Sequence, residues 1–200
     1  MGIVDIIKDN KERIMIMSQD KIKKFESKER LEELSPVETL KKAGFKEGMV
    51  LCDIGAGTGV FSIPATRISK KDIYALEKSD GMIEILENRI KEQGLTNLKV
   101  KKVESDILPL EDNVCDLVIL ITVLHHIDDK KIMMDEIKRI LKEKGRILVI
   151  EFHKRQTNSG PPVEMRLSEE ELVQFGKDYE LNTIDRFRLG DNFYGFIFEI

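Results

Sequence analysis

A glycine-rich turn directly after an apolar run has the clearest chemical meaning in this 200-residue chain. Residues 50–59 read Val-Leu-Cys-Asp-Ile-Gly-Ala-Gly-Thr-Gly, so Asp53 ends a buried-type strand and Gly55, Gly57 and Gly59 follow it. Glycines let the backbone approach a ligand closely, and a helix that starts after them offers unpaired N–H groups. The pattern predicts a ligand pocket at the carboxyl edge of a sheet. A turn with a purely structural role is the alternative.

The spacing of these glycines bears on the charge of the ligand. The dinucleotide fingerprint is G-x-G-x-x-G, which seats a pyrophosphate on a helix N-terminus. Residues 55–59 follow G-x-G-x-G instead, with Asp53 two residues upstream. A carboxylate beside the turn suits a cationic amine better than a phosphate. The sequence therefore favours a ligand with an ammonium group, and an NAD-dependent oxidoreductase is a competing hypothesis.

Two further acidic residues follow the next two apolar runs. Glu77 ends the run 72–77, where its carboxylate can accept hydrogen bonds from both hydroxyls of a ribose. Asp106 follows the run 98–103, where it can accept from an adenine amino group while Ile107 covers the ring. Each acid alone also fits a solvated loop residue. Acids at the ends of three successive strands favour a nucleoside pocket.

A parallel sheet is needed to bring these acids together. From residue 48 onward, short apolar runs alternate with amphipathic stretches, which predicts strands joined by crossover helices. Met82, Leu86 and Ile90 form the apolar face of one such helix, and Gly94 is expected to close it. Gly145 is expected to cap another helix, whose buried stripe includes Met133 and Leu141. The predicted strands in this region are 49–54, 72–77, 98–103, 115–121 and 146–152.

The two ends of the chain have a different texture. Residues 181–189 and 193–200 read as strands joined by the short turn 190–192, so they must be antiparallel. Residues 1–46 read as helical, with a fresh helix start at Ser35-Pro36. We expect a single domain over 1–200. Its predicted parts are a helical cap (1–46), a ligand-binding core (47–153) and a loop, helix and hairpin (154–200).

Composition narrows the class of protein. Hydrophobic residues make up 41% and charged residues 35%, as in an ordinary globular domain. The net charge of -4 opposes a nucleic-acid partner, because phosphate binding needs clustered Lys and Arg. Cys52 and Cys115 lie inside apolar runs and are expected to be buried packing residues, with no metal site. Without a secretory signal or a run long enough to span a membrane, the expected location is the cytoplasm.

Together these motifs resemble the class I S-adenosylmethionine-dependent methyltransferases, specifically the type 11, or ubiquinone/menaquinone-biosynthesis-like, branch. The residues that carry the resemblance are 53–59 with Phe61 behind them, Glu77 with Met82, 105–107 and 123–127. It spans roughly residues 25–200. It implies an α/β Rossmann-like fold with helices on both faces of a seven-stranded mixed sheet, ordered 3-2-1-4-5-7-6 with strand 7 antiparallel. The implied cofactor is S-adenosylmethionine, with S-adenosylhomocysteine as product.

The resemblance also implies a set of cofactor contacts. These are Asp53, Gly55, Ala56, Gly57, Gly59, Phe61, Glu77, Lys78, Met82, Ser105, Asp106, Ile107 and Thr122. Ala56 departs from the family, in which many members carry Cys or Ser, and we expect this to leave cofactor binding intact. The Asn/Asp-Pro-Pro-Tyr/Phe motif of enzymes that methylate base amines is missing, and Ile121 to His126 stand in its place. Methylation of base amines is therefore disfavoured.

The three histidines follow the fourth and fifth predicted strands. Methyl transfer from a sulfonium is an in-line displacement in which the protein chiefly aligns the reactants and excludes water. If the acceptor is a hydroxyl or a carbon acid, a base helps, and His125 and His126 are the candidate catalytic residues. Local packing or hydrogen bonding is their alternative role. His153 leads into a flexible loop, where a solvated role fits equally well.

The acceptor and the assembly stay open. The favoured function is methylation of a small molecule by a monomer or homodimer. A protein or RNA methyltransferase is an alternative, and so is a non-catalytic module that binds S-adenosylmethionine. The N-terminal helices are expected to close over the pocket with Phe25 as a cover, although Phe25 equally fits ordinary packing. Residues 15–17 (Met-Ile-Met) could mark a dimer contact.

Overall fold

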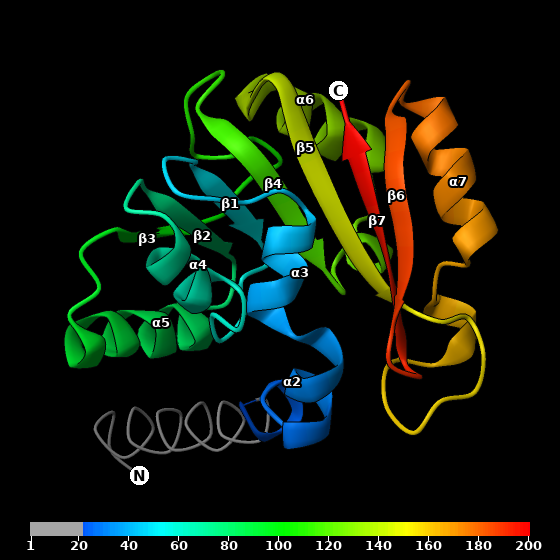
Figure 1. Cartoon of the computed structure of the whole chain (residues 1–200), viewed down its shortest axis with the longest axis horizontal. Coiled ribbons are helices and arrows are strands. Elements are labelled where there is room, and N and C mark those ends of the chain that lie inside the picture. The colour runs from blue at the N-terminus through cyan, green and yellow to red at the C-terminus, as the bar shows by residue number, and fades with distance from the viewer. Residues whose placement is uncertain (1–21) are drawn as a thin grey trace, which may run out of the picture.

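A seven-stranded sheet forms the centre of the computed structural model, which describes residues 22–200 (Figure 1). The strands are β1 (Leu51–Ile54), β2 (Ile73–Glu77), β3 (Leu98–Lys102), β4 (Cys115–Ile121), β5 (Leu141–Phe152), β6 (Asn182–Leu189) and β7 (Phe193–Glu199). Their order is β3-β2-β1-β4-β5-β7-β6, and β7 is antiparallel to both neighbours. The predicted fold class is therefore confirmed.

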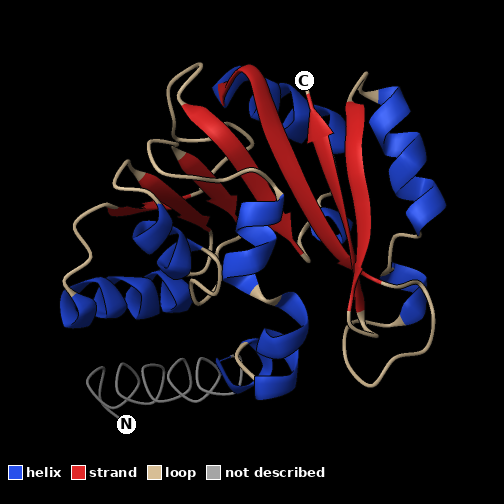
Figure 2. Cartoon of the chain, viewed as in Figure 1, coloured by secondary structure: helices blue, strands red, loops and turns tan. Residues whose placement is uncertain are grey.

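Helices cover both faces of this sheet (Figure 2). They are α2 (Lys28–Leu34), α3 (Pro36–Lys42), α4 (Ser62–Ile68), α5 (Asp80–Gln93), α6 (Lys130–Ile140) and α7 (Glu169–Asp178), with 3-10 turns η1 (Leu124–His126) and η2 (Val163–Met165). In one core cluster, the helices α2, α3, α4 and α5 pack on one face of the sheet. In the other, α6 and α7 pack on the opposite face. The strand β4 is almost entirely buried because it lies between these two cores, as its continuous apolar run predicts.

Most helix ends agree with the signals in the sequence. Gly94 closes α5 in the left-handed conformation, with φ 63°, and Pro36 begins α3 after Ser35. Ser168 begins α7 in a capping box with Glu171. These local signals set the lengths of the helices that pack on the sheet.

The expected role of Gly145 was wrong. The helix α6 ends at Ile140, and β5 begins at once with Leu141, so Gly145 lies inside the strand. The register between β4 and β5 shifts near Cys115, which lets residues 142–145 deviate from the ladder with Lys144 at φ 60°. Leu141 is therefore a strand residue, and Met134, rather than the half-buried Met133, fills the buried stripe of α6.

The site lies where the parallel strands end. Figure 1 shows α2 and the 153–162 loop at the same end of the sheet, beside the carboxyl ends of β4 and β5. Among residues 22–200, no helix is long and apolar enough to cross a membrane. The suggested contact at residues 15–17 and the first part of the predicted cap lie outside the described residues. The division into three parts stays a prediction.

Candidate active site

The three glycines of the turn after β1 have two different roles. All three have positive φ, at 72°, 56° and 85° for Gly55, Gly57 and Gly59, a conformation that favours glycine. A Cβ at Gly55 would lie 2.7 Å from Val123, and one at Gly59 would lie 2.8 Å from Leu86. At Gly57 the nearest atoms belong to Phe25, at 3.6 Å. Gly55 and Gly59 therefore allow close packing within the protein, whereas a side chain at Gly57 would lie in ordinary contact with the Phe25 ring.

Asp53, the acid that precedes this turn, is buried, with 2% of its surface exposed. The Ser62 hydroxyl at the start of α4 donates a hydrogen bond of 2.5 Å to its Oδ2. Burial raises the pKa of Asp53 to about 7, the Ser62 hydrogen bonds oppose this rise, and the nearby Glu77 carboxylate adds to it. Since no counter-ion pairs with this carboxyl group among residues 22–200, it would gain from a cationic ligand.

Glu77 lies at the end of β2 and links the neighbouring turns. Its Oε2 accepts from the Gly57 N–H, and its Oε1 accepts from the N–H groups of Lys78 and Ser79, each at 2.9 Å. A carboxylate has about four acceptor positions, so these bonds leave roughly one free. A ribose that binds through both hydroxyls would have to replace the bond to Gly57, which couples sugar binding to the glycine turn.

The remaining predicted cofactor contacts differ in exposure. Phe61 and Met82 are buried in the core behind the turn, and Lys78, Ser105 and Asp106 are exposed. The Ile107 side chain is 68% exposed, so a broad apolar surface is available on this side of the site. Phe61 and Met82 are thus core residues, and their contact with a cofactor stays a prediction.

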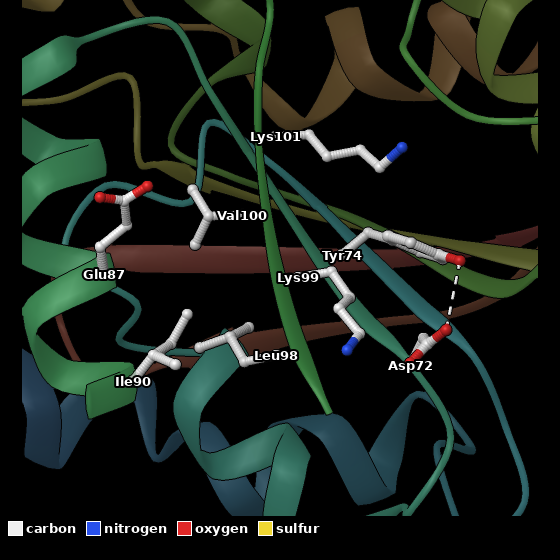
Figure 3. A pocket seen from close by; sticks show the side chains of 8 residues that line it. All are labelled: Asp72, Tyr74, Glu87, Ile90, Leu98, Lys99, Val100 and Lys101. Atoms are coloured by element: carbon white, nitrogen blue, oxygen red, sulfur yellow. Dashed lines mark hydrogen bonds between the residues drawn. The ribbon is translucent and has the colours of Figure 1, made fainter. Parts of the chain in front are cut away.

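Two hollows near the edge strand β3 are separate from the glycine turn. One of about 500 Å³ lies between β2, β3 and α5, where the Tyr74 hydroxyl donates to Asp72 at 3.5 Å (Figure 3). The other, of about 450 Å³, lies between Tyr74, Ile107 and Arg139. Lysines such as Lys101 line this edge. Solvated lysines are common on exposed edge strands, where they prevent pairing with other chains, so these hollows need no ligand to explain them. We therefore place the candidate site at the glycine turn.

The segment before α2 is anchored over the glycine turn. Arg89 of α5 pairs with both Glu26 oxygens, at 2.6 and 3.0 Å, and also donates to the Thr58 carbonyl at 2.7 Å. Since Phe25 precedes Glu26, this pair holds its ring above Gly57. The Phe25 ring thus lies against Gly57, and its role as a cover for a bound ligand stays a prediction.

Arg30 of α2 joins this segment to the ends of β4 and β5. Its Nη2 donates to Thr122 Oγ1 at 3.2 Å, and its guanidinium lies 5.5 Å from the Phe152 ring and 4.9 Å from the Phe193 ring. Burial lowers the pKa of Arg30 to about 10, and its Nε is buried without a hydrogen-bond partner in the described part of the chain. A charged, incompletely paired group thus lies beside Thr122.

The three histidines have unequal surroundings. His125 is held in η1 by Glu151 of β5, whose Oε2 lies 2.6 Å from Nδ1 and whose Oε1 accepts from the His125 N–H at 3.2 Å. His126 is more exposed, and partial burial of its ring, followed by the neighbouring His125, lowers its pKa. His153 is buried rather than solvated, and burial lowers its pKa, so the solvated role was wrong.

Sequence reasoning missed Glu151 and the role of Arg30. Glu151 was visible as the single acid in an otherwise apolar run, at the carboxyl end of a predicted strand. Arg30 carried no such signal, because its burial depends on Phe152 and Phe193 from the far end of the chain. Cys52 and Cys115 are buried, as predicted.

Comparisons with known proteins agree with this geometry. The methyltransferase domain family matches residues 45–185, which is more than half of the chain. The chain belongs to this family. A curated relative from Marinomonas sp. (strain MWYL1), the ubiquinone/menaquinone biosynthesis C-methyltransferase UbiE, is 27% identical over 122 residues. That match covers 60% of this chain and 49% of the relative, so the chain spans about half the length of the curated relatives it matches.

Solved structures give the same result for the methyltransferase domain. An S-adenosylmethionine-dependent methyltransferase from Aquifex aeolicus is 28% identical with a TM-score of 0.84, over 90% of this chain and 97% of that one. The [4+2]-cyclase SpnF has a TM-score of 0.73 at 17% identity, over 84% and 80% of the two chains, and shares the fold. The predicted class, a methyltransferase domain of the S-adenosylmethionine-dependent, UbiE-like kind, is confirmed.

The residues of the methyltransferase domain fit its cofactor. Asp53 is a buried carboxyl group for an ammonium, and Gly57 has no side chain between its backbone and the Phe25 ring. Thr58 adds a buried hydroxyl that has no hydrogen-bond partner within residues 22–200. Both acids and the turn lie at the carboxyl edge of the sheet, the usual ligand site of open α/β folds.

Proposed function

We propose that this protein transfers the methyl group of S-adenosylmethionine to a small molecule. The observation that carries the proposal is the arrangement of Asp53, Gly57 and Glu77 around one turn, with Phe25 held above it. The relatives named as C-methyltransferases support a carbon atom as the acceptor. Because the match covers only about half of that relative, its particular acceptor molecule is not carried over to this chain.

Each predicted contact has a distinct role in this proposal. Asp53 would hold the ammonium of the cofactor. The backbone of Gly57, which has no side chain, would lie against the methionine part. Glu77 would accept from the ribose hydroxyls after giving up its bond to Gly57. Asp106 would accept from the adenine amino group, with Ile107 against the ring. The bound cofactor supplies a methyl group that is already activated as a sulfonium.

The chain itself supplies alignment and exclusion of water. The Glu26–Arg89 pair and the Arg30–Thr122 bond hold the N-terminal segment across the ends of β1 and β4. Holding both reactants beneath this segment would favour an in-line displacement, because both lose the freedom to misalign. A segment held across the strand ends would also limit access and so favour a small acceptor over an RNA or a protein chain.

Calorimetry with S-adenosylhomocysteine and NAD tests the cofactor site. We expect the former to bind and NAD to show no heat, and Asp53→Ala to weaken binding at least tenfold. The exposed Asp178 of α7 provides a matched control, because Asp178→Ala removes a carboxylate far from the turn. Equal binding to wild type and Asp53→Ala would refute the role of this carboxylate.

Turnover separates an enzyme from a binding module. The full-length protein is incubated with the cofactor and a panel of phenols, hydroquinones, 1,3-dicarbonyls, thiols and amines, and S-adenosylhomocysteine is measured. We expect product with at least one small acceptor. Binding without turnover on any of them, or turnover only with RNA or protein, would contradict the proposal.

A further inference from the structure

The contacts between His125 and Glu151 stand apart from all other ion pairs in the described chain. The two side chains are 2% and 1% exposed, whereas the other ion pairs have at least one partner that is 23% exposed or more. Their short distance of 2.6 Å is typical of a charge-assisted hydrogen bond. A buried carboxylate is costly unless it is paired, so a position such as Glu151 calls for an explanation.

Glu151 holds both the backbone and the ring of His125. One oxygen accepts from the backbone N–H and the other contacts Nδ1, so the η1 turn and the ring orientation are fixed by one side chain. The register of the sheet sets Glu151 beside Tyr194 of β7, and burial raises the pKa of that tyrosine well above its usual range. The position of Glu151 is thus set by the sheet, while His125 lies in the turn after β4.

We propose that His125 and Glu151 form a dyad in which Glu151 positions the ring and His125 Nε2 takes a proton from the methyl acceptor. The inference rests on the proposed function and names its substrate class: an acceptor that must lose a proton. Such acceptors are phenolic or enolic hydroxyls and carbon acids next to oxygen. His125 is the catalytic residue of the pair, and Glu151 is a positioning residue.

Hydrogen bonding decides which nitrogen acts. With the Nδ1 proton donated to Glu151, the lone pair of the neutral ring lies on Nε2. Within residues 22–200, no side chain or backbone group forms a hydrogen bond with that nitrogen. His126 lacks such a carboxylate partner in the same part of the chain, and its ring centre lies 4.0 Å from that of His125. The geometry therefore distinguishes two adjacent histidines.

The charged and titratable groups around the dyad come from several elements. Arg30 of α2 and Tyr194 of β7 interact with Glu151. His126 lies next to His125, and the positive charges of Lys24 and Lys78 contribute to lowering the pKa of His126. These cations flank the dyad and would favour an acceptor that develops negative charge.

The proposed step balances as a displacement. The acceptor X–H bond breaks and its proton goes to His125 Nε2, while its electron pair forms the new bond to the methyl carbon. The sulfur–carbon bond of the sulfonium breaks with its pair on sulfur, which leaves a neutral thioether. The imidazolium is stabilised by Glu151 until it releases the proton to water.

Nitrogen NMR of the histidine rings tests the positioning role without turnover. The 15N-labelled full-length protein is recorded without cofactor, and the His125 ring is assigned with His125→Asn. We expect the neutral ring to carry its proton on Nδ1, and Glu151→Leu to move it to Nε2. Glu169→Gln, which alters the exposed carboxylate near His153, should leave the His125 signals unchanged. An Nε2–H ring in the wild type would overturn the proposal.

Kinetics with catechol, hydroquinone and acetylacetone as acceptors test the catalytic role. We expect His125→Asn to lower kcat about 100-fold with little change in KM, since general-base catalysis contributes about that much or more. Glu151→Gln should lower kcat about tenfold and Glu151→Asp should restore part of it. The dyad predicts a smaller loss in His126→Asn than in His125→Asn.

The two proposals fail in different ways. If the wild-type protein does not bind S-adenosylhomocysteine, the proposed function is wrong. If the wild type binds the cofactor and transfers the methyl group, and His125→Asn has the same kcat, only the proposed dyad is wrong. Because Glu151→Leu could unfold the protein, thermal melts accompany each variant, and Glu151→Gln preserves the side-chain shape. If none of the acceptors is methylated, the position of the proton on the wild-type His125 ring still tests whether Glu151 positions that ring.

Discussion

The Asp53 carboxyl group is predicted to make cofactor binding depend on pH. Burial raises its pKa to about 7, so it is mostly protonated at pH 5.5 and mostly ionised at pH 7.5. An ammonium ligand binds the ionised form. We expect the affinity for S-adenosylhomocysteine to rise roughly 20-fold over this range, because binding must be preceded by loss of the proton at low pH. Calorimetry at the two pH values measures it, and Asp53→Asn should abolish the dependence.

The same group affects folding with the opposite sign. A carboxyl group whose folded pKa exceeds its unfolded value contributes its full stability below about pH 4 and loses it as pH rises to about 7. Removing the Ser62 hydroxyl in Ser62→Ala should raise the pKa further, because its hydrogen bonds oppose the effect of burial. Binding by this variant would then increase at a higher pH than in the wild type. A midpoint that moved downward would contradict the assignment.

Gly57 and Gly59 are predicted to respond differently to the same substitution. Both have positive φ, so alanine strains the backbone by about 1–2 kcal/mol at either site. At Gly59 the new methyl would also lie 2.8 Å from Leu86, within the core, so we expect the larger fall in Tm. At Gly57 it would lie in ordinary contact with the Phe25 ring and the Gly55 carbonyl, so the larger loss should be in S-adenosylhomocysteine affinity. Thermal melts and calorimetry on both variants measure this contrast, and the reverse order would contradict it.

How far single residues could be predicted depended on the range of the interactions that define them. Asp53 and the glycines were visible because their spacing is local and chemically unusual. The pairing of His125 with Glu151 was not, since the partners are 26 residues apart and meet only through the register of β4 and β5. Without that contact, His125 and His126 look equivalent in the sequence. The roles of the predicted cofactor contacts remain predictions.

Arg166 is predicted to hold the loop after β5 in place. It donates to the backbone carbonyls of His153, Arg155, Ser159 and Pro161 and to the Thr157 hydroxyl, and it is 5% exposed. We expect Arg166→Ala to destabilise the fold by about 3 kcal/mol, because the buried His153 carbonyl and several part-buried acceptors lose their partner at once. Urea unfolding measures this loss. Hydrogen exchange should rise in residues 154–162 before it rises in the sheet.

The exposed Arg188 of β6 is the matched control for that substitution. Its ion pair with Asp191 spans 3.9 Å at the surface, where such pairs contribute little. Arg188→Ala should therefore change the free energy of unfolding by less than about 0.5 kcal/mol. Equal losses in the two variants would show that Arg166 does not organise the loop.

The strands and helices could be predicted where local signals were strong. The β4 run and the turn between β6 and β7 matched because an apolar run and a short polar turn each define their own boundaries. The junction of α6 and β5 did not match, since Gly145 looks like a helix cap in the sequence. The backbone there follows the shifted register with β4, a long-range constraint that no local pattern carries.

The complete sheet depends on its last strand, which gives the final prediction. Although β7 is the last strand in the chain, it lies between β5 and β6 and hydrogen-bonds to both. Its residues 193–198 are buried on both faces, where Phe193 and Phe196 belong to opposite core clusters. A chain that stops after Leu189 would expose the inner edges of two strands and both clusters. We expect it to lose cooperative unfolding, because burying one phenylalanine contributes about 2 kcal/mol and domains are stable by only about 5–15 kcal/mol. Circular dichroism melts measure this, and removal of Ile200 alone, which follows β7, should leave the transition intact. A cooperative transition in the shorter chain would mean that the sheet can close without β7.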